Sequence, residues 1–209
     1  MLEEALSHLD KILGTYSEGE YYDKVVEAKK RYFELTGLAN EEDDDFEARM
    51  RCFNDWFILR YPLANGSTAI EDYLSKSGIS EECQEVLRGV RYSIFEFTGK
   101  SLSGKLVIKD LLSNEKLIFT PNSSKIPVFK ADFFIGRILR YESDFLLMNG
   151  ICLLPKEGKS MIKKQIKKIR KLADPEVEES FLLEVEKLKT KWKRFGHVDP
   201  SKIFTFKDL

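Results

Sequence analysis

The densest group of side chains that could bind a ligand is the basic run between residues 159 and 171. Ammonium groups at this density suit phosphates, so the run is typical of a surface that meets nucleic acid. Ile162, Ile166 and Ile169 recur at helical spacing and indicate a helix docked by an apolar stripe. An ordinary solvated helix face and a phosphate-binding face therefore both stay open. The lysines that the second interpretation uses are Lys163, Lys164, Lys167, Lys168 and Lys171.

Groups suited to catalysis are few. The two histidines, His8 and His197, lie near opposite ends of the chain, and neither has the spacing of a metal-binding pair. Gly99-Lys100-Ser101 is similar to the end of a phosphate-binding loop, but Ile94 stands where that loop needs a glycine. A turn between strands explains the triplet better. An enzyme is not predicted, and one that uses only carboxylates and lysines stays open without named residues.

Metal ligands at a recognisable spacing are also missing from the sequence. Cys52, Cys83 and Cys152 are scattered, odd in number and without a Cys-x-x-Cys pair, which fits a reducing compartment. The acidic run from Glu41 to Asp45 lacks the alternation and the glycine of a calcium loop. It is better explained as the start of a helix, where carboxylates meet the positive end of the dipole. We therefore expect no metal and no cofactor.

One helix carries two polar residues directly before two large aromatic ones, in the segment Asn54-Asp55-Trp56-Phe57. This order draws Asp55 toward the protein body, where we expect it to bond Arg60 or an amide of the following loop. A ligand groove beside the aromatic residues is the alternative.

The composition excludes several classes of protein. The chain has 209 residues, of which 43% are apolar and 33% charged, so a disordered chain, a collagen-like repeat and a disulfide scaffold are ruled out. Acids stand at the start, where a signal peptide needs bases, and the longest apolar stretch, 145–154, is interrupted by Asn149. We expect a cytoplasmic protein without a membrane partner.

The net charge of -1 hides an uneven distribution. Residues 1–60 carry 15 acids and 8 bases, residues 61–150 carry 11 of each, and residues 151–209 carry 9 acids and 15 bases. The two ends attract each other if they are close in space; otherwise the basic end is available for an anionic partner. Cover of the basic helix by the acidic run would therefore argue against nucleic acid.

The first ninety residues predict short amphipathic helices. Leucines at helical spacing end at Gly14, Ser17 to Glu20 has the form of a capping box, and the next helix ends at Gly37. A third helix is expected from the acidic run to Tyr61-Pro62. Thr68 and Ser80 are expected to cap two more.

From Arg91 the pattern changes to short apolar runs divided by turn residues, which predicts a small antiparallel sheet. Pro127 places the fourth run at an edge. Tight connections favour a strongly bent sheet or a partly open barrel. The expected strands are residues 92–97, 105–111, 116–120, 126–129, 133–141 and 145–154.

The C-terminal part returns to helix. After the basic helix, Asp174-Pro175 caps a second one that ends before Gly196. The tail from Ile203 to Phe206 is expected to add one strand or stay loose. The predicted class is α+β: an N-terminal helical bundle (1–90), a small antiparallel bent sheet or partly open barrel (91–155) and a C-terminal helical pair (156–209), all in one unit.

Several segments resemble a family of uncharacterised bacterial proteins that have a helical N-terminal part followed by a small β-sheet region. The most specific is Trp56-Phe57 followed by Tyr61-Pro62-Leu63; similar stretches are 68–74, 93–97, 106–112 and 132–139. The resemblance covers residues 46–155 and implies a bacterial source. Some members carry a cysteine-rich zinc motif at the C-terminus, which this chain lacks, so the resemblance implies no metal, activity or catalytic residue.

Together these features predict a non-enzymatic binding or adaptor module whose partner is a protein. The alternative is binding of RNA or single-stranded nucleic acid by the small β region and the 159–171 helix. A third interpretation places the basic helix on a membrane surface, but its stripe lacks the Trp or Phe that deepens insertion. The oligomeric state does not follow from the sequence.

Overall fold

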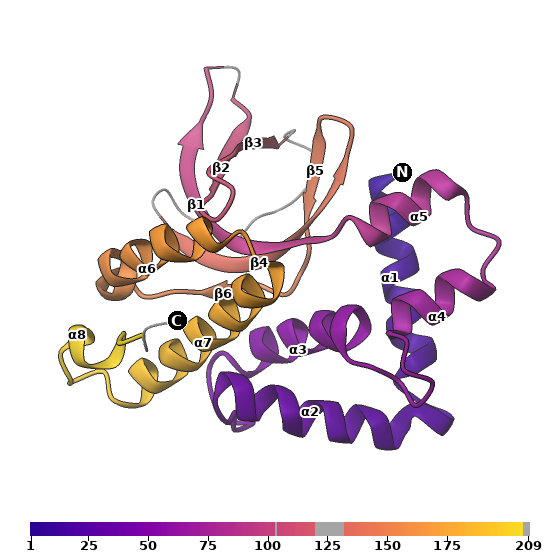
Figure 1. Ribbon diagram of the computed structural model, residues 1–209, viewed down its shortest axis with the longest axis horizontal. Helices are drawn as coiled ribbons and strands as arrows, with labels where there is room; N and C mark the ends of the chain where they lie inside the picture. The colour runs from indigo at the N-terminus through magenta and orange to yellow at the C-terminus, as the bar shows by residue number, and fades with distance from the viewer. Residues whose placement is uncertain (103, 120–131, 207–209) are drawn as a thin grey trace.

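The computed structural model describes residues 1–102, 104–119 and 132–206. Its N-terminal part is helical and forms one side of the molecule (Figure 1). The helices are α1 (Leu2–Tyr16), α2 (Tyr22–Thr36), α3 (Phe46–Arg60), α4 (Ala69–Lys76) and α5 (Glu81–Arg88), with a short 3-10 turn η1 (Gly19–Tyr21) before α2.

Most predicted helix ends are confirmed by local hydrogen bonds. Thr68 forms a complete capping box with Glu71, Ser80 accepts from the amide of Cys83, and Gly37 ends α2 with a φ of 91°. The predicted capping box at Ser17 is wrong. Its hydroxyl instead donates to Leu13 O, because α1 continues through Gly14 and buries Tyr16. A glycine inside a helix costs only about 1 kcal/mol, which this burial offsets.

The acidic run does not start α3, so that prediction is also wrong. Residues 41–45 form turns, and the helix begins at Phe46. Asp44 and Asp45 instead form ion pairs with Lys193 and Lys189 near the C-terminal end of α7 (Pro175–Arg194). The acids are held by attraction between segments about 150 residues apart, which outweighs their preference for a helix start.

The central element is an antiparallel sheet that curls into a half-barrel (Figure 1). Its strand order is β3-β2-β1-β4-β5, and β6 also pairs with β4. Phe119 of β3 contacts Phe145 of β5, with ring centroids 5.8 Å apart, so side chains from the two edges meet across the curl. The strands are β1 (Arg91–Lys100), β2 (Leu106–Asp110), β3 (Lys116–Phe119), β4 (Phe133–Tyr141), β5 (Asp144–Leu147) and β6 (Cys152–Leu153).

The sheet agrees with the predicted strands at four of the six positions. The predicted strand 145–154 is instead two strands, because the chain leaves the sheet around Gly150, where a Cβ would overlap Asp55. The predicted edge strand 126–129, with Pro127, lies outside the described residues. Gly99-Lys100-Ser101 lies where β1 ends in a hairpin, as expected.

Alternation along β4 separates two apolar cores. Phe133, Ile135 and Leu139 face the helices, whereas Phe134 and Ile138 pack inside the half-barrel. The C-terminal helices cover the first face (Figure 1), and the isoleucine stripe of α6 (Lys159–Leu172) is buried there as predicted. This alternation places residue 137 between sheet and helices.

The C-terminal segment confirms one prediction and corrects another. Asp174 caps α7 by accepting from the amides of Glu176 and Val177. The tail forms neither a strand nor a loose end: α8 (Pro200–Ile203), capped by Asp199, turns Phe204 into the core. The 3-10 turn η2 (Lys156–Gly158) precedes α6. Among the described helices, none combines the length and apolar character needed to cross a bilayer.

Candidate functional site

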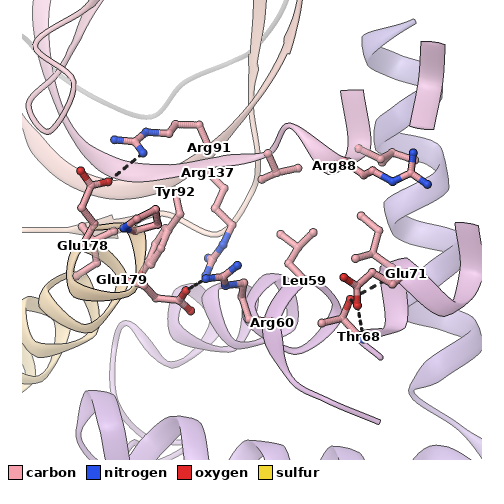
Figure 2. Close-up of a pocket in the computed structure, with 15 residues that line it drawn as sticks. Leu59, Arg60, Thr68, Glu71, Arg88, Arg91, Tyr92, Arg137, Glu178 and Glu179 are labelled. Carbon is pink, nitrogen blue, oxygen red and sulfur yellow. Dashed lines mark hydrogen bonds and ion pairs between the residues drawn. The ribbon is translucent and has the colours of Figure 1, made fainter. Parts of the chain in front are cut away.

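A pocket of about 420 Å³ lies where the helical part, the sheet and the start of α7 meet. We call it the arginine pocket, because arginines come to it from α3, α5, β1 and β4. Figure 2 shows Arg137 and Arg60 pointing toward each other in the middle of the pocket, with Arg91 turned toward Glu178 on one side and Arg88 on the opposite side. Its charged and hydroxyl side chains are Arg60, Arg88, Arg91, Arg137, Thr68, Glu71, Tyr92, Glu178 and Glu179.

Arg137 is the unusual residue of this pocket. Only 2% of it is exposed, and its Nη2 atom is buried without a hydrogen-bond partner in the described part of the chain. Its guanidinium lies 4.0 Å from the ring centroid of Tyr92, its cross-strand neighbour between β1 and β4. Ring stacking favours a cation but supplies no hydrogen-bond acceptor. Figure 2 shows the side chain pointing from the sheet toward Arg60.

The other arginines of the pocket have partners. Arg60 pairs with Glu179, and Arg91 Nη1 lies 3.0 Å from a carboxylate oxygen of Glu178 (Figure 2). Arg88 donates to the neutral side chain of Gln84 at 3.0 Å. Within the described residues, neither Arg88 nor Arg137 forms an ion pair. Four arginines and three glutamates of the described chain line the pocket, which leaves an excess of one positive charge.

Arg60 and Arg137 bring two positive charges close together. Hydrogen bonding to Glu179 raises the pKa of Arg60, and the charge of Arg137 acts in the opposite direction. Like charges held in a partly dry pocket favour an anion between them, and guanidinium groups bind carboxylates and phosphates through paired N–H donors.

Asp55 is a buried carboxylate whose charge interacts with that of Arg137. Its Oδ2 atom is buried against Gly150 and has no hydrogen-bond partner in the described residues. Burial raises the pKa of Asp55 to about 6, although Arg137 and the amide of Gly150 favour its charged form. The prediction that Asp55 bonds Arg60 is wrong, because Arg60 pairs with Glu179. The amide beside it belongs to the β5–β6 connection, not to the loop after α3.

The stability of the fold is expected to depend on the protonation of Asp55. A pKa of about 6, against an ordinary value of 3.8, means that the folded state holds this proton more tightly. The favourable contribution is complete below about pH 4 and is lost as the pH rises through about 6. As the pH rises from about 4 to 8, the unfolding free energy of Asp55→Asn should increase by up to about 3 kcal/mol relative to that of the parent.

Urea unfolding of both proteins across this pH range measures the effect. Glu47→Gln, an exposed change on the same helix, is the control. A difference between Asp55→Asn and the parent that stays constant with pH would contradict the assignment.

A buried carboxylate on α7 fixes the ring under Arg137. Glu186 accepts hydrogen bonds at 2.7 Å from the hydroxyl groups of Tyr32 and Tyr92. Burial, and next the negative charge of Glu186, raise the pKa of both tyrosines well above its ordinary value. The two hydroxyls remain donors, so α2, β1 and α7 are tied together beneath the arginine pocket.

The lysines proposed from the sequence lie elsewhere. Lys163 pairs with Glu96 at 2.7 Å, while Lys164, Lys167, Lys168 and Lys171 are exposed on α6. None of these five lines the arginine pocket. The acidic run does not cover them, because its ion pairs are made with α7.

Sequence reasoning did not select the arginines of the pocket. One signal pointed to Arg137, which is a charged residue within the apolar run 133–139. Its neighbours two residues away in the strand, Ile135 and Leu139, face the core, so Arg137 lies on the same face. The presence of Arg60, Arg88 and Arg91 around one pocket had no local signal, since it depends on how three elements meet.

Comparison of the chain with protein-family models, with curated proteins and with solved structures finds no match. The site is therefore interpreted from its own geometry. The resemblance noted from the sequence stays a prediction.

Proposed function

We propose that this protein binds a small anionic ligand in the arginine pocket, with Arg137 as the principal contact. The observation that carries the proposal is Arg137, a residue only 2% exposed whose buried Nη2 has no hydrogen-bond partner among the described residues. A binding module was also predicted from the sequence, but with a protein as its partner; the small anion proposed here replaces that partner.

An anion would supply an acceptor for the Nη2 group of Arg137. A charge removed from water costs several kcal/mol unless it is paired and hydrogen-bonded, and a carboxylate or phosphate group supplies both charge and acceptors. Arg60, toward which Arg137 points, would contact the same ligand nearer the solvent. A volume of about 420 Å³ suits a metabolite-sized molecule.

The chemistry of the lining supports binding over proton transfer. Arginine stays protonated at every physiological pH and cannot act as a general base. Glu178 and Glu179 accept hydrogen bonds from Arg91 and Arg60, so the charges of both carboxylates are already paired in the walls of the pocket. The ligand's negative group would lie between these pairs and Arg137.

Calorimetric titration at low ionic strength tests the proposal. The ligands are inorganic phosphate, a phosphomonoester and a dicarboxylate, with an uncharged polyol and a quaternary ammonium ion as controls. We expect saturable binding of at least one anion and none of the controls. The phosphate and carboxylate arms distinguish the two chemical sources. Absence of binding by all three anions would contradict the proposal.

Nucleic-acid binding by α6 and the small β region is the second candidate. One observation favours it: Lys164, Lys167 and Lys171 are exposed, and the acidic run pairs with α7 instead of covering them. If this face binds single-stranded RNA, changing the three lysines to Glu should lower the salt dependence of log K by about 2, at about 0.7 per phosphate contact.

Filter binding across a salt series measures this slope. Lys11→Glu with Lys30→Glu and Lys187→Glu, a change of three exposed lysines on other helices, is the control. Retention of RNA with the same slope in the α6 variant would remove this candidate.

A further inference from the structure

Three side chains of different ligand chemistry meet between α1 and α5: Glu4, His8 and Cys83. Each offers one ligand atom, and these three atoms lie within 4.8 Å of one another. The two helices pack side by side near the N-terminus (Figure 1). We propose that these residues form a Zn²⁺ site that links α1 to α5, independently of the anion site.

The donor set fits zinc by type. Thiolate sulfur, imidazole nitrogen and carboxylate oxygen are its usual protein ligands, at about 2.0 to 2.3 Å from the ion. Glu4 and His8 are four residues apart on α1 and so share one face of the helix. Cys83 is fixed on the opposite side, where its amide donates to the Ser80 cap of α5. Small side-chain rotations would bring the three atoms to tetrahedral spacing.

A hydrogen bond to Tyr73 already orients the imidazole of His8. His8 Nδ1 lies 3.0 Å from the hydroxyl of Tyr73 on α4. A histidine that binds a metal commonly uses one ring nitrogen and donates the N–H of the other to such a partner, which fixes the tautomer. With Nδ1 engaged by Tyr73, Nε2 is the nitrogen free to bind the ion.

The cluster opens to solvent on one side and is dry on the other. Cys83 is completely buried, His8 is half-buried and Glu4 is exposed. An ion would therefore enter from the solvent beside Glu4 and meet the sulfur of Cys83 at the buried end of the cluster. Burial, and next the charge of Glu4, raise the pKa of the Cys83 thiol, so the metal-free group is protonated. Zinc would displace that proton, and its affinity should rise with pH.

Three protein ligands leave one position of a tetrahedral ion for water or another small ligand. No spacing in the sequence indicates this site, because Cys83 is 75 residues from His8. Only the packing of α5 on α1 brings them together.

Metal titration of the untagged full chain tests the proposal, with Zn²⁺ for affinity and Co²⁺ for spectroscopy. We expect one ion per chain and a sulfur-to-cobalt charge-transfer band in the near ultraviolet. Cys83→Ser should abolish the band, and Cys83→Ser and His8→Gln should each weaken Zn²⁺ binding by more than about 100-fold. Tyr73→Phe should cost about 10-fold, the size of an outer-sphere effect.

Two controls separate this site from adventitious binding. Cys152→Ser removes a different buried thiol, and Glu3→Gln removes a carboxylate beside the cluster; both should keep the band and the affinity. The proposal is overturned if the parent binds no zinc, or if Cys83→Ser and His8→Gln bind it as tightly as the parent. His8→Gln keeps the test valid if Cys83→Ser does not fold, because His8 is not fully buried.

Discussion

Arg137→Met is expected to lower the affinity for the pocket's anion by at least about 100-fold, or about 3 kcal/mol, because it removes one member of a buried hydrogen-bonded charge pair. Methionine fills much of the same volume without charge. Because the charge of Arg137 favours the charged form of the buried Asp55, the folded state should also lose some stability at neutral pH. Calorimetric titration and urea unfolding measure the two effects.

Two matched variants separate charge from geometry. Arg137→Lys keeps the charge but loses the planar fork, so it should bind the anion with intermediate affinity. Arg88→Met removes an exposed arginine of the pocket and should cost no more than about 10-fold, as expected for a solvated contact. Unchanged affinity in Arg137→Met would show that the anion binds elsewhere.

Glu186→Ala is expected to destabilise the fold by at least about 3 kcal/mol. The change leaves the hydroxyls of Tyr32 and Tyr92 without their acceptor, and each hydrogen bond to a charged group contributes about 1.5 to 3 kcal/mol. It also opens a cavity between α2, β1 and α7. Urea unfolding at neutral pH measures the loss.

Glu186→Gln, Tyr32→Phe and Tyr92→Phe test whether the loss comes from these bonds. Glutamine keeps one acceptor and should lose less than alanine. In a double-mutant cycle, Glu186 should couple to each tyrosine. Lys187→Ala, an exposed neighbour on α7, should change the stability by less than about 0.5 kcal/mol. A loss that small for Glu186→Ala would refute the role assigned to it.

The sequence predicted those parts of the fold that depend on neighbouring residues. The caps at Thr68 and Asp174 were correct because each hydroxyl or carboxylate acts on amides two or three residues away. The sheet region was recognised from its period, and its curl from the short connections. The split at Gly150 was missed, because the close approach of Gly150 to Asp55 on α3 depends on residues far apart in the sequence.

Charges were harder to place than apolar residues. The acidic run looked like a helix start, but attraction to Lys189 and Lys193 decides its position. Likewise, the lysines of α6 stood out by number, whereas the candidate site rests on a single buried guanidinium. The density of charged residues along the chain indicates neither which of them are buried nor which lack a hydrogen-bond partner. These two properties distinguish Arg137.

The most direct test of the anion site is nuclear magnetic resonance of the arginine side chains during titration with inorganic phosphate or a dicarboxylate. Assignment uses Arg60→Lys, Arg88→Lys and Arg137→Lys. We expect the Nε–H resonance of Arg137 to shift most and saturably, with a smaller shift at Arg60 and the smallest at Arg88. An anion that binds while the Arg137 resonance stays unchanged would contradict the proposed anion site.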